Sequence, residues 1–106
     1  FLRDTDDRPT LRDCMREQAD DIARRLTRRR LAAHTVQVKV RYGDFTTLTR
    51  QITCEEPLAD AKEIYRLGCH LLARDRLVTR PLRLLGLGVT NLVETAARQL
   101  RLAIEA

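Results

Sequence analysis

Thr35-Val-Gln-Val-Lys-Val-Arg-Tyr-Gly-Asp-Phe-Thr-Thr-Leu-Thr-Arg-Gln-Ile52 is the stretch that decides the fold. In its first half, apolar residues from Val36 to Tyr42 alternate with polar ones, which is the period-two pattern of a strand with one buried face. Gly43-Asp44 can turn the chain back, because glycine tolerates the positive φ that a two-residue hairpin turn requires. The stretch therefore predicts a β-hairpin with one apolar face and one polar face.

Two registers of this hairpin are compatible with the sequence. A two-residue turn places Tyr42 opposite Phe45, and the polar face then carries Gln37, Lys39, Arg41, Thr46 and Arg50. That register leaves Leu48 and Ile52 on the polar face. A one-residue slip or a bulge would reverse the faces of the second strand and leave the first strand unchanged. Lys39 and Arg41 lie on the polar face in both registers, so this face is predicted to bind an anion.

A helix is predicted before the hairpin and another after it. Pro9 suits a first helical turn, and Thr10 followed by Asp13 approximates a capping box. An apolar stripe runs from there through Leu26. The segment 54–59 is expected to break the strand, after which Asp60, with Glu63 three residues on, caps a second helix. Gly68 would let that helix approach its neighbours closely.

The last predicted element is the strand Leu82–Val89, which is almost entirely apolar and should therefore lie inside a sheet. Arg83 is expected to emerge on the polar face, and Gly86 is expected to form a bulge or a close backbone approach. Helix, strand, strand, helix and strand together predict an α+β two-layer sandwich, an antiparallel sheet with two helices on one face.

Composition limits the function of this single small domain. The chain has 106 residues, 20 Lys+Arg against 15 Asp+Glu and a net charge of +5, which favours a polyanionic partner. No stretch is apolar enough to span a membrane and no signal peptide is present, so a soluble, cytoplasmic protein without a membrane partner is expected. The three cysteines, Cys14, Cys54 and Cys69, are too widely spaced to suggest a disulfide framework or a zinc site.

The sequence offers no catalytic or metal-binding constellation. Phosphoryl transfer needs carboxylates gathered around two metal ions. The adjacent acids of this chain fall in the N-terminal segment, in a predicted helix and in the segment after the hairpin, where the side chains of neighbouring residues point apart; they are Asp6-Asp7, Asp20-Asp21 and Glu55-Glu56. We expect no catalysis, metal or cofactor in this chain. The chain has two Phe, two Tyr and no Trp, so it offers few aromatic rings to stack on unpaired bases. The backbone of a duplex is therefore the better match.

The segment Thr35–Arg50, followed after a helix by Leu82–Leu92, resembles the little-finger domain of Y-family DNA polymerases, with the bacterial polymerase IV branch nearest. The resemblance begins at Asp4 and implies a little-finger domain over residues 1–93 and a tail over residues 94–106. It implies a β-α-β-β-α-β fold whose first strand is largely missing here, and a module that grips primer-template duplex DNA for an error-prone translesion polymerase. The implied DNA-binding residues are Gln37, Lys39, Arg41, Thr46, Arg50 and Arg83. The parent's Mg²⁺ would lie in a catalytic domain outside this chain.

The tail suggests a second partner. Gln99-Leu100-Arg101-Leu102-Ala103 is similar to the Gln-Leu-x-Leu-Phe peptide by which these polymerases bind the sliding clamp, although Ala103 replaces the aromatic anchor. Gln99, Leu100 and Leu102 are thus candidate clamp-binding residues, and a protein-interaction module is the alternative function. An RNA-binding sheet is a third class, but such sheets place aromatic rings where this chain has Lys39, Arg41 and Arg50.

The missing first strand has its own consequence. The resemblance places that strand inside the sheet, so a gap with unpaired backbone groups is expected between its neighbours. The gap would be filled by further residues, by closure of the last strand onto the hairpin, or by self-association through an exposed sheet edge.

Overall fold

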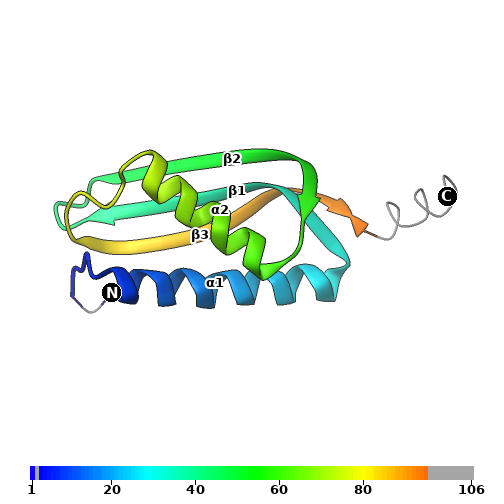
Figure 1. Ribbon diagram of the computed structural model, residues 1–106, viewed down its shortest axis with the longest axis horizontal. Coiled ribbons are helices and arrows are strands. Elements are labelled where there is room, and N and C mark those ends of the chain that lie inside the picture. The colour runs from blue at the N-terminus through cyan, green and yellow to red at the C-terminus, as the bar shows by residue number, and fades with distance from the viewer. Residues whose placement is uncertain (2, 96–106) are drawn as a thin grey trace, which may run out of the picture.

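The computed structural model describes residues 1 and 3–95, which form two helices and a three-stranded antiparallel sheet. The elements are α1 (Arg8–Arg29), β1 (Leu31–Tyr42), β2 (Thr47–Leu58), α2 (Ala61–Arg74) and β3 (Leu82–Glu94). Both helices lie on one face of the sheet (Figure 1). The predicted α+β two-layer sandwich is confirmed. Neither described helix is long and apolar enough to cross a membrane.

The core lies between the sheet and the helices. Val36, Val38 and Val40 of β1 are fully buried and face inward at every second position. Met15 of α1 and Leu71 of α2 are also fully buried and pack against this apolar row from the helical layer. The apolar positions of the alternation in β1 are therefore the ones that face the helices.

The sheet order is β2-β1-β3, and β1 pairs with β3 from Leu31 to Tyr42. No internal gap separates the hairpin from the last strand, because β1 and β3 are direct neighbours; of the three outcomes considered from the sequence, pairing of the last strand with the hairpin is the one observed. The segment that precedes α1 pairs instead with the outer edge of β3, where Thr5 and Leu82 exchange backbone hydrogen bonds of 2.9 and 2.7 Å. A strand leading into Thr5 would thus extend the sheet at its edge.

The hairpin turn differs from the predicted one. The Tyr42 N–H donates to the Thr46 carbonyl, and the Phe45 N–H donates to the Tyr42 carbonyl, both at 2.9 Å, so the loop comprises residues 43–45. Phe45 adopts φ 68°, and Gly43 does not have a positive φ. A left-handed residue at the end of a three-residue loop is a common hairpin geometry. The extra loop residue shifts the register by one, which is the alternative that the sequence left open.

Several element boundaries also differ from the sequence-based ones. Asp7, rather than Thr10, caps α1, and its Oδ2 accepts hydrogen bonds from the N–H (3.1 Å) and the hydroxyl of Thr10. The predicted Asp60 cap of α2 is confirmed by a 3.3 Å bond from the Glu63 N–H. β2 does not break at residue 54, because an edge strand tolerates Pro57 and a bulge.

The two glycine predictions have opposite outcomes. Gly68 is buried in α2, and a Cβ there would lie 2.9 Å from Leu87 Cδ1, so the predicted close approach is confirmed. Gly86 pairs regularly with Lys39, and the bulge of β3 lies at Arg83 instead, between the Arg41–Leu84 and Tyr42–Leu82 pairs.

Candidate nucleic-acid interface

The face of the sheet opposite the helices is the candidate site, and its middle is formed by β1. Gln37, Lys39 and Arg41 alternate with the buried valines and so project to this side. Because β1 is the central strand, these side chains lie between two neighbouring strands (Figure 1). The structure thus brings together three of the six predicted DNA-binding residues.

The neighbouring strands complete this surface, which we call the open face. The β2 residues that lie opposite Arg41, Lys39 and Gln37 are Thr47, Thr49 and Gln51, respectively. The β3 residues that pair with Arg41, Lys39 and Gln37 are Leu84, Gly86 and Gly88, respectively. The nine residues that define the open face include two cations, several hydrogen-bonding groups and no carboxylate, which suits an anionic partner.

The open face has low relief around Lys39. Gly86 lies directly beside Lys39 and Gly88 beside Gln37. A Cβ built on Gly88 would meet nothing within 4 Å, and one on Gly86 would only touch its neighbours at 3.9 Å. Short side chains at Thr47 and Thr49 flank the other side. A bulky polymer can therefore approach the strand backbone and the two cations without displacing protein atoms.

Lys39 and Arg41 are held differently. Arg41 Nε donates to Thr47 Oγ1 at 3.1 Å, which fixes the guanidinium across the β1–β2 pair while its Nη groups remain available for a phosphate. Lys39 is exposed and makes no ion pair or side-chain hydrogen bond among residues 1 and 3–95. A solvated ammonium beside an oriented guanidinium is a suitable arrangement for non-specific phosphate contacts.

Arg50 lies on the other face, so its predicted position on the polar face is wrong. It pairs with Val38, whose side chain faces the helices. Its Nε lies 3.3 Å from Asp75 Oδ2, and its Nη1 donates to the Thr49 carbonyl at 2.8 Å. Hydrogen bonds from Arg74, together with the charges of Arg74 and Arg50, hold the pKa of Asp75 below its usual value. Arg50 is therefore part of an ion-pair cluster at the end of α2.

Thr46 and Arg83 also lie away from the middle of the open face. Thr46 belongs to the hairpin loop, where its N–H donates to Asp44 Oδ1 at 3.0 Å, and Thr47 takes the expected position opposite Arg41. Arg83 lies at the bulge of β3, where its Nε is 3.3 Å from Asp4 Oδ1 and its guanidinium carbon is 4.5 Å from the centre of the Phe45 ring. Both residues border the loop end of the sheet.

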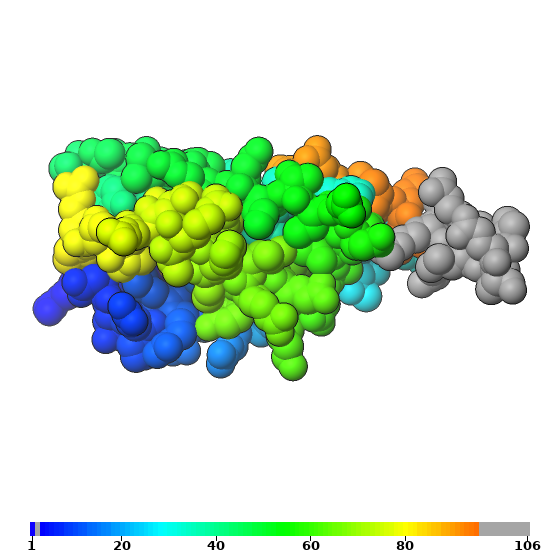
Figure 2. All heavy atoms as spheres, turned by 45° about the horizontal axis from the view of Figure 1, so that its top comes forward, coloured from blue at the N-terminus to red at the C-terminus, as the bar shows by residue number. Residues whose placement is uncertain are grey.

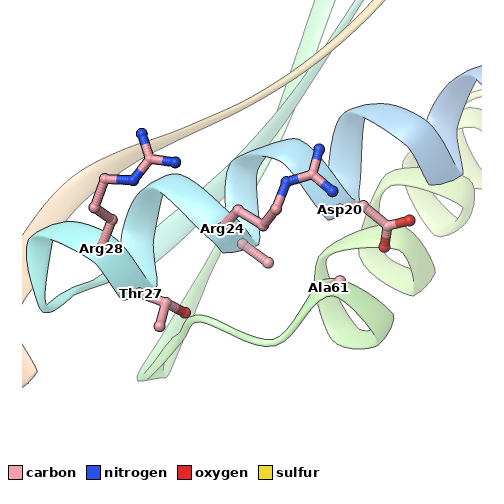
Figure 3. A pocket seen from close by; sticks show the side chains of 6 residues that line it. Asp20, Arg24, Thr27, Arg28 and Ala61 are labelled. Carbon is pink, nitrogen blue, oxygen red and sulfur yellow. The ribbon is translucent and has the colours of Figure 1, made fainter.

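The arginine-rich second half of α1 is separate from the open face. Figure 3 shows Arg24 and Arg28 extending from the same side of α1, near the start of α2 at Ala61. Arg24 and Arg25 pair with Asp21 at 3.7 and 3.0 Å and remain largely exposed. These side chains form a solvated helix surface, and exposed pairs of this kind contribute little to stability.

Sequence reasoning missed Thr47, Thr49 and Gln51. The signal was present, because Leu48 and Ile52 alternate with these polar residues and both are partly buried against the core. The assumption of a two-residue turn outweighed that alternation. The tail residues Gln99, Leu100 and Leu102 lie outside the described residues, and within the described part of the chain no three His, Cys, Asp or Glu side chains gather to hold a metal ion.

The fold and the open face define a class of protein: a small two-layer α+β module with a cationic open sheet face. The chain matches the model of the impB/mucB/samB family C-terminal domain over residues 1–102, and it belongs to that family. The predicted membership in the little-finger domains of Y-family polymerases is thereby confirmed.

Two relatives that are similar in sequence are both named DNA polymerase IV. The chain is 35% identical over 96 residues to DNA polymerase IV of Listeria monocytogenes serotype 4b (strain CLIP80459), a match that covers 91% of this chain and 27% of that protein. It is 41% identical over 71 residues to DNA polymerase IV of Halorhodospira halophila (strain DSM 244 / SL1), covering 67% and 20%. The chain thus spans about a quarter of the length of the curated relatives it matches.

A solved structure has the same fold. It is described as a complex of beta-clamp processivity factor and little finger domain of PolIV, and it superposes with a TM-score of 0.67 at 21% identity. The match covers 85% of this chain and 80% of that chain. At this identity the likeness supports the two-layer arrangement of sheet and helices.

Proposed function

We propose that this chain is the duplex-binding module of an error-prone translesion DNA polymerase, and that it grips the phosphates of primer-template DNA with its open face. The observation that carries the proposal is the placement of Lys39 and Arg41 on the central strand, with Gly86 and Gly88 beside them and no carboxylate among the nine residues that define the open face. Contacts to phosphates position a protein without reading base sequence, so binding would be sequence-tolerant.

The contact set in this proposal differs from the one that the resemblance implied. Lys39 and Arg41 bind phosphates, and Gln37, Thr47, Thr49 and Gln51 donate or accept hydrogen bonds around them. Thr46 and Arg83 can touch DNA only at the border of the face, and Arg50 stays outside the interface because Asp75 holds it on the helical side.

Titration with a labelled primer-template duplex at several salt concentrations tests this function. Each phosphate neutralised contributes about 0.9 to the slope of log affinity against log salt. We expect weak binding with a slope of roughly two from Lys39 and Arg41, and similar affinity for duplexes of unrelated sequence. Binding that is independent of salt, or that strongly prefers one sequence, would contradict the proposal.

The parent protein would supply the chemistry. DNA-directed nucleotidyl transfer needs two metal ions held by carboxylates. In the described part of this chain, no three His, Cys, Asp or Glu side chains lie close enough together to hold a metal ion. The proposal therefore assigns Mg²⁺ to a catalytic domain elsewhere in the parent, which would act in the cytoplasm, and assigns this chain no chemical step. Incubation of the chain with dNTP, Mg²⁺ and primer-template should give no extension.

A second function is supported by the tail. The predicted boundary between residues 93 and 94 falls inside β3, because Glu94 pairs with Leu31 and the Thr95 N–H donates to the Arg30 carbonyl. We propose that the tail begins after Thr95, and that Gln99, Leu100 and Leu102 bind a sliding clamp. The solved structure of similar fold, a complex of beta-clamp processivity factor and little finger domain of PolIV, favours this partner. Ala103 lacks the aromatic anchor, so we expect Ala103→Phe to strengthen clamp binding in fluorescence anisotropy. Equal affinity in a chain truncated after residue 95 would contradict it.

A further inference from the structure

A groove lies between the first turns of α1 and the C-terminal end of α2, on the helical side of the molecule. Figure 2 shows this region, where the blue start of α1 lies beside the yellow segment that follows α2. Leu11, Leu72 and Val78 contribute apolar surface to the groove, and three arginines, Arg8, Arg12 and Arg76, line it as well. Among the described residues, Asp6 is the one acid that lines it.

Two of the three arginines of the groove have no ionic partner among the described residues. Arg8 and Arg76 are exposed and make no ion pair or side-chain hydrogen bond among residues 1 and 3–95, and Arg12 interacts with the carboxylate of Asp7. By contrast, Arg24, Arg25, Arg50, Arg74, Arg80 and Arg83 each pair with an aspartate. The groove therefore has a rim of three arginines, which Asp6 and the interaction of Arg12 with Asp7 offset only in part.

Arg76 is also held in a strained backbone conformation. It follows α2 with φ 49°, and the next residue, Leu77, donates its N–H to the Leu72 carbonyl at 3.0 Å. This is the left-handed position after a helix, where glycine is favoured because a Cβ is strained there. The fold thus keeps an arginine, rather than the less costly glycine, at the edge of the groove.

We propose that this groove binds an acidic protein segment that carries a large aliphatic side chain. The aliphatic group would cover Leu11, Leu72 and Val78, and flanking carboxylates would pair with Arg8, Arg12 and Arg76. Among the described residues, no aromatic side chain lines the groove to stack a base, and the apolar surface of the groove matches an aliphatic side chain better than a sugar–phosphate strand. A protein segment therefore fits the groove better than a nucleic acid. Because the groove and the open face lie on opposite sides, a protein segment and a duplex could bind together.

Fluorescence anisotropy with a designed probe tests this inference. The probe is a short labelled peptide with two central leucines between aspartates and glutamates. Its matched controls replace the leucines with serine or the acids with lysine. We expect the parent peptide to bind the chain, and both control peptides to bind at least about tenfold more weakly, a difference of about 1.4 kcal/mol.

Protein variants locate the binding. Arg76→Glu should weaken the peptide about tenfold. Ala73→Gln should also weaken it, because Ala73 is an exposed groove residue and a longer, uncharged side chain would fill the space. Arg29→Glu is the charge-matched control, since Arg29 is exposed at the far end of α1. Equal weakening by Arg29→Glu, no effect of Ala73→Gln in a variant with an unchanged circular dichroism spectrum, or displacement of the peptide by excess duplex would overturn the proposal.

Discussion

The side-chain oxygen of Gln18 on α1 accepts a hydrogen bond from the backbone N–H of Leu87 on β3 at 2.8 Å. The amide nitrogen of the same side chain donates to the Leu85 carbonyl at 2.9 Å. One glutamine therefore satisfies two backbone groups on the edge of β3 that does not face β1, as a neighbouring strand would do. Beyond the Thr5–Leu82 bridge, the helical layer thus protects the outer edge of β3.

Gln18→Leu should destabilise the domain and expose that edge. Leaving the two partly buried backbone groups without partners costs on the order of 1 to 3 kcal/mol of unfolding free energy. Urea denaturation measures the loss, and sedimentation over a wide concentration range measures the self-association that the sequence suggested. Gln51→Leu, at an exposed β2 position, is the matched control. If Gln18→Leu stays monomeric at the highest concentration, the edge does not drive association.

Charge removal should separate the open face from the helical face. Lys39→Ala should flatten the salt dependence of duplex binding by about 0.9 in log-log slope, because one phosphate contact is lost. Arg41→Ala should do the same. Arg50→Ala should leave the slope unchanged and instead lower stability slightly, since it removes the ion pair with Asp75. A flattened slope for Arg50→Ala would place that residue back in the interface.

The strand β1 and the Asp60 cap could be predicted from sequence because each depends on local residues, an alternation in one case and a capping side chain in the other. The register of the hairpin could not, since it depends on whether Phe45 accepts a left-handed conformation, which Gly43 seemed to make unnecessary. That single loop residue decided the face of Arg50. The roles of Arg83 and Gln18 depend on contacts with Asp4 and Leu87, many residues distant in the chain.

The cap of α1 should make stability depend on pH. Hydrogen bonds from the Thr10 side chain and backbone, with a smaller contribution from the Arg12 charge, lower the pKa of Asp7 below its reference value of 3.8. Folding therefore favours the ionised carboxylate. Its stabilising contribution is complete above the unfolded-state pKa and is lost as the pH falls through the lower folded-state pKa.

Asp7→Asn tests this dependence, because asparagine keeps the capping oxygen and removes the titrating charge. The variant should lose less stability than the parent chain when thermal unfolding is followed from neutral pH down to about pH 3. Asp13→Asn, within α1 and beyond its first turn, serves as the control. Parallel pH profiles for the parent and Asp7→Asn would show that the cap does not titrate in this range.

The low relief of the open face should be as important for duplex binding as its charge. Gly88 has open space where a Cβ would be and its φ is not positive, so Gly88→Leu should fold with little change in melting temperature. The new side chain would stand beside Gln37 and keep a phosphate strand away from Lys39. We expect duplex affinity to fall roughly tenfold, a difference of about 1.4 kcal/mol in binding free energy, although Lys39 and Arg41 keep their charges. Ala73→Leu adds the same bulk at an exposed position on the helical side and should leave duplex binding intact. If both variants bind as the parent does, the strands around Gly88 do not approach the DNA, and the interface must lie nearer the hairpin loop.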